Sequence, residues 1–180
     1  MDWRAVRHDV LRLTKTPAEG ISIFKVIKDY SKSHPRTKRD LFAVVDAHEI
    51  PAAETTVPFD GSPELLRLLS ERSKVGLVTM QGLRACSRVL ERFELMTCLK
   101  VVLTREDSLD RAEQLRMACD SLESVPSEAF FCGDKKGDLD AGRSLGMTVA
   151  LVGKRAREDW GPDYLFPEFD QLSSFLESLG

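Results

Sequence analysis

The pattern of apolar positions divides the chain near residue 57 into a helical part and a part in which strands and helices alternate. In the first part, apolar residues recur every three or four positions, which predicts amphipathic helices. These helices cover about 2–13, 21–31 and 36–54. In the second part, short apolar runs predict strands separated by helical patterns. The strands cover 75–78, 99–103, 129–132 and 148–152, and a closing helix extends to about Leu179.

This alternation predicts the fold class and the domains. Strands that alternate with helices are typical of an α/β fold, here a doubly wound parallel sheet with helices on both faces. We therefore expect a helical domain over residues 1–55 and an α/β core over residues 56–180. Ser62 is expected to cap the first helix of the core, with Pro63 in its first turn. Gly146 is expected to end a helix that begins near Asp138.

Composition excludes several classes of protein. The chain has 26 basic and 29 acidic residues and a net charge of -3, which argues against nucleic-acid binding. No apolar run approaches the ~20 residues that a membrane helix needs. The four cysteines form no CxxC pair and lie apart from the histidines, so we expect reduced thiols in a cytoplasmic protein and no zinc site.

Polar residues follow three of the predicted strands. Thr79 follows the first, residues 104–107 follow the second, and Gly133-Asp134 ends the third, with Asp138 four residues beyond Asp134. Ligands of open parallel sheets bind at the carboxyl ends of the strands. Mg²⁺ is bound by oxygen ligands and often by only one or two protein carboxylates. Asp134 and Asp138 are therefore the candidate metal ligands.

These residues resemble motifs of the haloacid dehalogenase (HAD) superfamily. GD-x-x-x-D at 133–138, with Ala141-Gly142 and Leu145-Gly146-Met147 after it, is similar to its fourth motif, and Thr79 is similar to the hydroxyl of its second motif. Residues 58–61 resemble the segment that leads from cap to core, and residues 1–55 resemble the small C1-type helical cap of phosphoglycolate-phosphatase-like members. The resemblance implies Mg²⁺-dependent hydrolysis of a small phosphorylated metabolite through an aspartyl-phosphate. Thr79 would bind the phosphoryl group, and Asp134 and Asp138 would hold the metal directly or through water.

The chain also departs from the family pattern. No D-x-D-G-T segment, which carries the family's nucleophile and general acid–base, occurs in it. A start site assigned too late, a shortened chain or a naturally truncated gene would each explain this. Leu109 stands where the third-motif lysine aligns best. Arg111 is the candidate replacement in catalysis and phosphate binding, and Arg105 is a weaker one. Lys135 is a further candidate for phosphate binding.

Without the first motif, the central first strand of the sheet is missing, and we expect the chain to be inactive as it stands. Unpaired buried backbone groups cost about 1–3 kcal/mol each. We therefore expect low stability, local rearrangement, or a homo-oligomer in which a partner strand fills the open gap in the sheet.

Three other interpretations stay open. Residues 41–46 would form a strand ending at Asp46, which with His48 would mimic the first motif as D-x-H, although the helical spacing favours a cap helix. A non-catalytic HAD-like binding or assembly module would lack the first motif by nature. A response-regulator-like receiver would need an acidic cluster near its first strand, which the sequence lacks.

Overall fold

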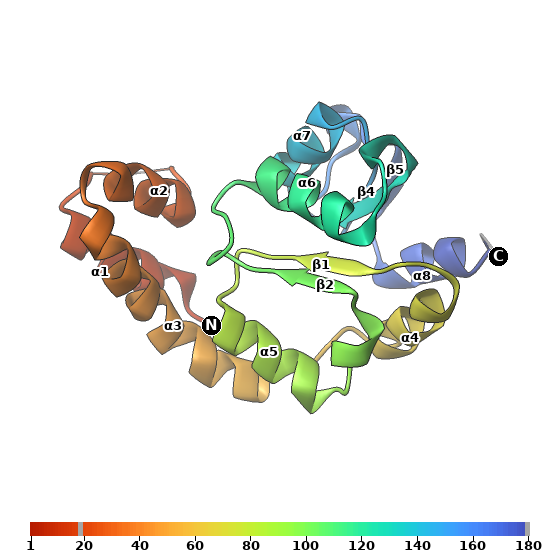
Figure 1. Cartoon of the computed structure of the whole chain (residues 1–180), viewed down its shortest axis with the longest axis horizontal. Helices are drawn as coiled ribbons and strands as arrows, with labels where there is room; N and C mark the ends of the chain where they lie inside the picture. The colour runs from red at the N-terminus through yellow and green to blue at the C-terminus, as the bar shows by residue number, and fades with distance from the viewer. Residues whose placement is uncertain (18–19, 179–180) are drawn as a thin grey trace. The chain divides into compact units, whose positions relative to one another are not determined.

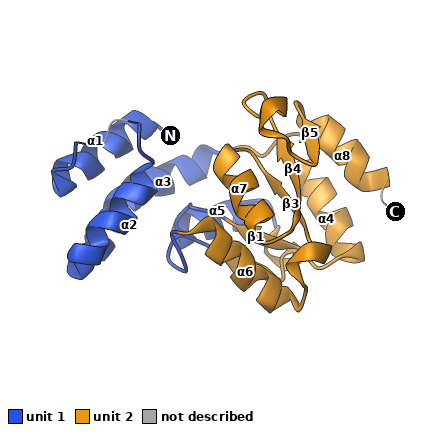
Figure 2. Ribbon diagram, turned by 90° about the horizontal axis from the view of Figure 1, so that it is seen from above, with its two compact units in different colours: residues 1–56, 79–94, 104–109 blue, residues 57–78, 95–103, 110–180 orange. Residues whose placement is uncertain are grey.

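The computed structural model describes residues 1–17 and 20–178, and Leu179 lies outside this range. The chain forms two compact units, coloured separately in Figure 2. Unit 1 comprises residues 1–56, 79–94 and 104–109, and unit 2 comprises residues 57–78, 95–103 and 110–180. Within the described ranges, no helix is long and apolar enough to cross a membrane.

Unit 1 is helical. It contains α1 (Trp3–Thr14), α2 (Ile23–Ser33), α3 (Lys38–Thr55) and α5 (Leu83–Arg92), with a 3-10 turn at Pro35–Thr37. Asp2 caps α1, because its carboxylate accepts hydrogen bonds from the backbone N–H groups of Arg4 and Ala5. The predicted helices over 2–13, 21–31 and 36–54 are confirmed to within a few residues.

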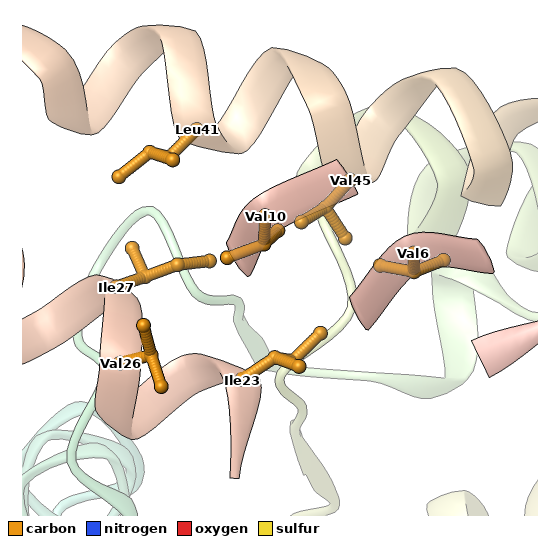
Figure 3. Close-up of a cluster of buried hydrophobic side chains, with 7 residues drawn as sticks. All are labelled: Val6, Val10, Ile23, Val26, Ile27, Leu41 and Val45. Atoms are coloured by element: carbon orange, nitrogen blue, oxygen red, sulfur yellow. The ribbon is translucent and has the colours of Figure 1, made fainter. Parts of the chain in front are cut away.

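The core of unit 1 forms where α1, α2 and α3 turn their aliphatic side chains toward one another (Figure 3). Its buried members are Val6, Val10, Ile23, Val26, Ile27, Leu41 and Val45. Their spacing within each helix is three or four residues, as an amphipathic face requires. Outside this core, Trp3 and Leu13, which share the apolar face predicted for the first helix, remain about half exposed.

Unit 2 is an α/β structure. Its strands are β1 (Gly76–Val78), β2 (Val101–Leu103), β3 (Phe130–Gly133), β4 (Thr148–Val152) and β5 (Tyr164–Phe166). Its helices are α4 (Ser62–Arg72), α6 (Arg111–Leu122), α7 (Lys136–Ser144) and α8 (Phe169–Ser178). Figure 2 shows α6 and α7 on one side of β3 and β4, with α4 and α8 on the other. The predicted α/β class with parallel strands is confirmed.

The strands of unit 2 form two separate parallel sheets. One pairs β1 with β2, which run side by side in Figure 1, and the other has the order β3-β4-β5. Val78 of β1 nevertheless packs against the same apolar cluster as Phe131 of β3, so both sheets border one core. In the described part of the chain no strand pairs with the outer side of β1 or of β3. The expected interruption of the sheet is therefore present.

Several local predictions need correction. Gly61, with φ of 75°, is the N-cap of α4, and the hydroxyl of Ser62 donates instead to the carbonyl oxygen of Phe59. Leu83, the first residue of α5, is 50% exposed. Gly146 does follow α7, with φ of 76°. The strand β5 was not predicted.

Candidate functional site

The turn between β3 and α7 carries the two predicted metal ligands. β3 ends at Gly133, and α7 begins at Lys136, so Asp138 lies in the first turn of the helix and is buried. Its Oδ2 accepts a hydrogen bond from the backbone N–H of Asp134 at 3.3 Å. A Cβ atom on Gly133 would lie 2.5 Å from the Cβ of Asp138. Glycine is therefore required at 133 for Asp138 to fold back on the end of the strand.

Arg111 and Asp138 are brought together. Arg111 is the first residue of α6, whose N-cap is Asp110, and its Nε donates to Oδ1 of Asp138 at 2.9 Å. Its Nη1 donates to the side-chain oxygen of Gln114 at 2.7 Å. The two side chains of the pair are 19% and 11% exposed, so the ion pair is largely shielded from water. The positive charge of Arg111 therefore lies directly beside Asp138, the second carboxylate of the GD-x-x-x-D pattern.

Asp134 and Lys135 project from the same turn into solvent. Their side chains are 65% and 76% exposed, and Nζ of Lys135 is 3.9 Å from Oδ1 of Asp134. Asp134 thus offers an exposed carboxylate directly at the carboxyl end of β3. Among the residues that the structure describes, no group of three or more His, Cys, Asp or Glu side chains is arranged to hold a metal.

This donor set fits Mg²⁺ better than a metal that needs a complete protein cage. Mg²⁺ usually keeps several waters and takes one or two carboxylates together with substrate phosphates. The exposed carboxylate of Asp134 is an oxygen ligand of the kind that such an ion takes. Both carboxylate oxygens of Asp138 already accept hydrogen bonds, Oδ1 from Arg111 and Oδ2 from the backbone N–H of Asp134.

Cys132 of β3 adjoins this turn. The residue is exposed, yet the pKa of its thiol is raised to about 11, first by desolvation and then by the carboxylate of Asp138. The thiol is therefore protonated at neutral pH, and it is a poor nucleophile there.

Thr79 belongs to unit 1, whereas the other four predicted site residues belong to unit 2. It follows the end of β1, and its Oγ1 accepts a hydrogen bond from the backbone N–H of Gln81 at 3.0 Å. The side chain is half buried, and this bond folds residues 79–82 into a tight loop before α5.

The sequence prediction missed a buried ionic network beside this loop. Arg105 is fully buried, and its guanidinium pairs with Asp46 and Glu49 of α3. One signal was present in the sequence. Glu49 continues the four-residue spacing of Leu41 and Val45, which places its carboxylate on the apolar face of α3. A carboxylate buried there needs a cationic partner.

The rival nucleophile is excluded by this arrangement. Residues 38–55 form a helix, so Asp46 does not end a strand, and it is ion-paired with Arg105. Nε2 of His48 is 3.0 Å from a carboxylate oxygen of Asp9 on α1. The cap helix that the spacing favoured is therefore confirmed here as a helix, and the alternative D-x-H motif is wrong. Leu109, at the position of the family lysine, packs against the apolar core of unit 1.

Comparison with known proteins identifies one family. A model described as haloacid dehalogenase-like hydrolase matches residues 15–152. N-acetylmuramic acid 6-phosphate phosphatase of Pseudomonas aeruginosa is 28% identical over 144 residues, which are 74% of this chain and 63% of that protein. The chain thus spans slightly less than two thirds of the length of this curated relative.

Solved structures of this class share the fold. A haloacid dehalogenase-like hydrolase from Streptococcus pneumoniae matches 96% of this chain and 89% of its own, at 13% identity and a TM-score of 0.66. A HAD phosphatase from Thermococcus onnurineus matches 94% and 79%, at 20% identity and 0.63. L-2-haloacid dehalogenase from Xanthobacter autotrophicus matches 98% and 86%, at 11% identity and 0.60. At these identities the likeness concerns the fold alone.

Proposed function

The chain belongs to the haloacid dehalogenase-like hydrolase family, and we propose that it serves Mg²⁺-dependent hydrolysis of a small phosphomonoester. The observation that carries this proposal is the strand-to-helix turn of unit 2. There an exposed carboxylate, Asp134, stands beside a buried one, Asp138, that is ion-paired to Arg111. A phosphate-bearing substrate needs both a site for a hard cation and fixed positive charge, and this turn offers both.

Each predicted residue receives one role in this proposal. Asp134 holds the metal, and Asp138 holds it directly or through water, while keeping Arg111 in place. When bound, Mg²⁺ would neutralise phosphate charge and orient the phosphoryl group. Arg111 takes over the task of the third-motif lysine. Thr79 binds the phosphoryl group through its hydroxyl, and the exposed ammonium of Lys135 attracts the anion.

The sequence contains no D-x-D-G-T segment, and we therefore expect no turnover by these 180 residues alone. An apolar strand that ends in this motif would have to come from elsewhere. The outer sides of β1 and β3, which no described strand covers, are the edges to which such a strand would pair.

The substrate proposal follows the relative from P. aeruginosa. N-acetylmuramic acid 6-phosphate is the first compound to assay, because that relative is named for its hydrolysis and shares 28% identity over 144 residues. We further propose residues 1–55 as the cap that selects the substrate and residues 56–180 as the core. The four cysteines are free thiols, which fits the proposed cytoplasmic location.

A second candidate function is a non-catalytic assembly module. The specific observation in its favour is again the pair of open strand edges, which invite pairing with another chain, including a second copy. Sedimentation analysis distinguishes the two states, because a homo-oligomer formed through these edges dissociates on dilution and a monomer does not change.

The decisive experiment adds a segment of five apolar residues and D-x-D-G-T to the N-terminus and measures phosphate release from a panel of sugar phosphates. We expect Mg²⁺-dependent release that EDTA abolishes and that Asp134→Asn lowers by about 10–100-fold. Asp140→Asn is the matched control, because Asp140 lies on the same helix α7 with an exposed side chain that pairs with Lys136.

Metal binding is measured independently of turnover, by the loss of the free Mn²⁺ paramagnetic resonance signal when the unmodified chain is added. If Mn²⁺ does not bind and the extended protein releases no phosphate, the enzymatic proposal is refuted and the assembly module is favoured.

A further inference from the structure

The guanidinium of Arg105 is the centre of a buried network in unit 1. It is 0% exposed and pairs with the carboxylates of Asp46 and Glu49, one helical turn apart on α3. Its Nη1 also donates to the backbone carbonyl oxygen of Met80 at 3.3 Å. The ring of Phe42, on the same helix, lies 5.3 Å from its central carbon and supports the guanidinium by a cation–π contact.

The same network fixes the backbone that follows Thr79. The N–H of Gly82 donates to Glu49 at 3.0 Å, and the N–H of Leu83 donates to Glu106 at 3.0 Å. The N–H of Arg105 itself donates to the carbonyl oxygen of Gln81 at 3.4 Å. Every residue from 80 to 83 therefore has a backbone group bonded to Arg105, to one of its carboxylate neighbours, or to Thr79.

The packing at Gly82 leaves no room for a side chain. A Cβ atom there would overlap both the guanidinium of Arg105 and the carboxylate of Asp46. The loop and the network are thus in direct contact, and a shift of Arg105 must be transmitted to the loop.

The positive charge of Arg105 offsets carboxylates that would otherwise repel a phosphate group bound at the loop. Three carboxylates, those of Asp46, Glu49 and Glu106, surround this single cation. The pKa of the nearby Cys86 thiol is raised to about 11, first by burial and then by the negative charges of Glu106 and Glu49. Without Arg105, a phosphate dianion at the loop would meet uncompensated negative charge.

We infer that Arg105 is a positioning residue. It holds the backbone of residues 80–83 in the conformation in which Thr79 binds phosphate, and it links that conformation to the cap helix α3. The inference rests on the proposed phosphoryl-binding role of Thr79. The planar guanidinium of arginine can donate to two carboxylates and a carbonyl oxygen at once. Lysine keeps the positive charge but lacks this geometry, so it should not replace Arg105.

The test compares Arg105→Lys with Arg88→Lys in the unmodified chain. Arg88 of α5 pairs with Glu54 of α3 at 2.8 Å, so the control alters a different arginine–carboxylate pair on the same helix α3. Two quantities are measured at a temperature where each variant is folded. They are the amide hydrogen exchange of Gly82 and Leu83, and the affinity for inorganic phosphate from an NMR titration of the loop amides.

In Arg105→Lys we expect both amides to exchange about 10–100-fold faster, because Glu49 and Glu106, which accept their hydrogen bonds, are then held in place by fewer charged contacts. Phosphate affinity should fall about 3–10-fold, because only the molecules that retain the competent loop bind. Arg88→Lys should change neither quantity. If Arg105→Lys does not fold, Glu49→Gln serves instead, since it keeps an oxygen for Gly82 but loses the ionic bond to Arg105.

The outcomes separate the inference from the proposed function. Unchanged exchange in Arg105→Lys, or faster exchange with unchanged phosphate affinity, overturns the positioning role. If the unmodified chain binds no phosphate at all, the role of Thr79 is overturned, and the inference built on it falls too. Loss of phosphate binding in Thr79→Val, with normal exchange at Gly82, supports the role of Thr79 on which the inference rests.

Discussion

Replacing Gly133 by alanine should disrupt the turn that carries the candidate metal ligands. The added Cβ would lie 2.5 Å from the Cβ of Asp138 and 3.0 Å from its Cγ and Oδ2. Carbon atoms in contact prefer separations of about 3.5–4.0 Å, so Asp138 must move by roughly 1 Å. Such overpacking costs about 1–3 kcal/mol, and displacement of Asp138 also weakens its ion pair with Arg111.

The free energy of unfolding of Gly133→Ala should therefore fall by about 2–4 kcal/mol in total. Part of this loss comes from the weakened ion pair, because hydrogen bonds to a charged group contribute about 1.5–3 kcal/mol and only part of that contribution is lost. The control is Gly137→Ala. A Cβ at Gly137 meets nothing within 4 Å, and the residue lies within α7. Alanine there should stabilise the chain by about 0.5–1 kcal/mol through its higher helix propensity.

Urea unfolding at pH 7 measures both changes as shifts of the midpoint at constant slope. The melting temperature of Gly133→Ala should fall by about 4–16 °C. Equal stabilities for the two alanine variants would refute the close approach of Asp138 to Gly133. A destabilised Gly133→Ala that binds Mn²⁺ as the parent does would show that Asp138 takes no part in holding the metal.

Three further predictions concern other parts of the chain. Cys132 should react with a disulfide reagent at pH 7.5 about 20-fold more slowly than an ordinary thiol, because its pKa is raised to about 11 and the scarcity of thiolate outweighs the higher nucleophilicity of that thiolate. The rate should climb with pH to about 11; a fast reaction at pH 7.5 contradicts this. In His48→Phe, Asp9 loses the hydrogen bond that chiefly lowers its pKa below 3.8. That depressed pKa stabilises the fold fully above about pH 4, and the stabilisation is lost as the pH falls through the lowered pKa. The parent should therefore have the higher urea midpoint at pH 7, and the difference should shrink in acid. Ile27→Ala should cost about 2–5 kcal/mol, since Ile27 is fully buried in the core of Figure 3; a cost below about 1 kcal/mol would show that this core is not packed.

The sequence by itself determined the local elements of this protein. The run Thr148–Val152 was predicted as a strand with the bounds that the structure gives, because a short apolar run rich in β-branched residues is typical of a strand buried on both faces. The three N-terminal helices followed from their apolar spacing. The Gly133-Asp134 turn followed from the fourth-motif pattern, which places two carboxylates across the start of one helix.

Only the tertiary structure decided which distant residues meet. Arg105 and Glu49 are 56 positions apart, and Arg111 and Asp138 are 27 apart, so no local periodicity records either pair. Hydrophobic spacing reports which face of an element is buried, but it does not report against what. Which cation offsets a buried carboxylate therefore depends on the folding of the whole chain.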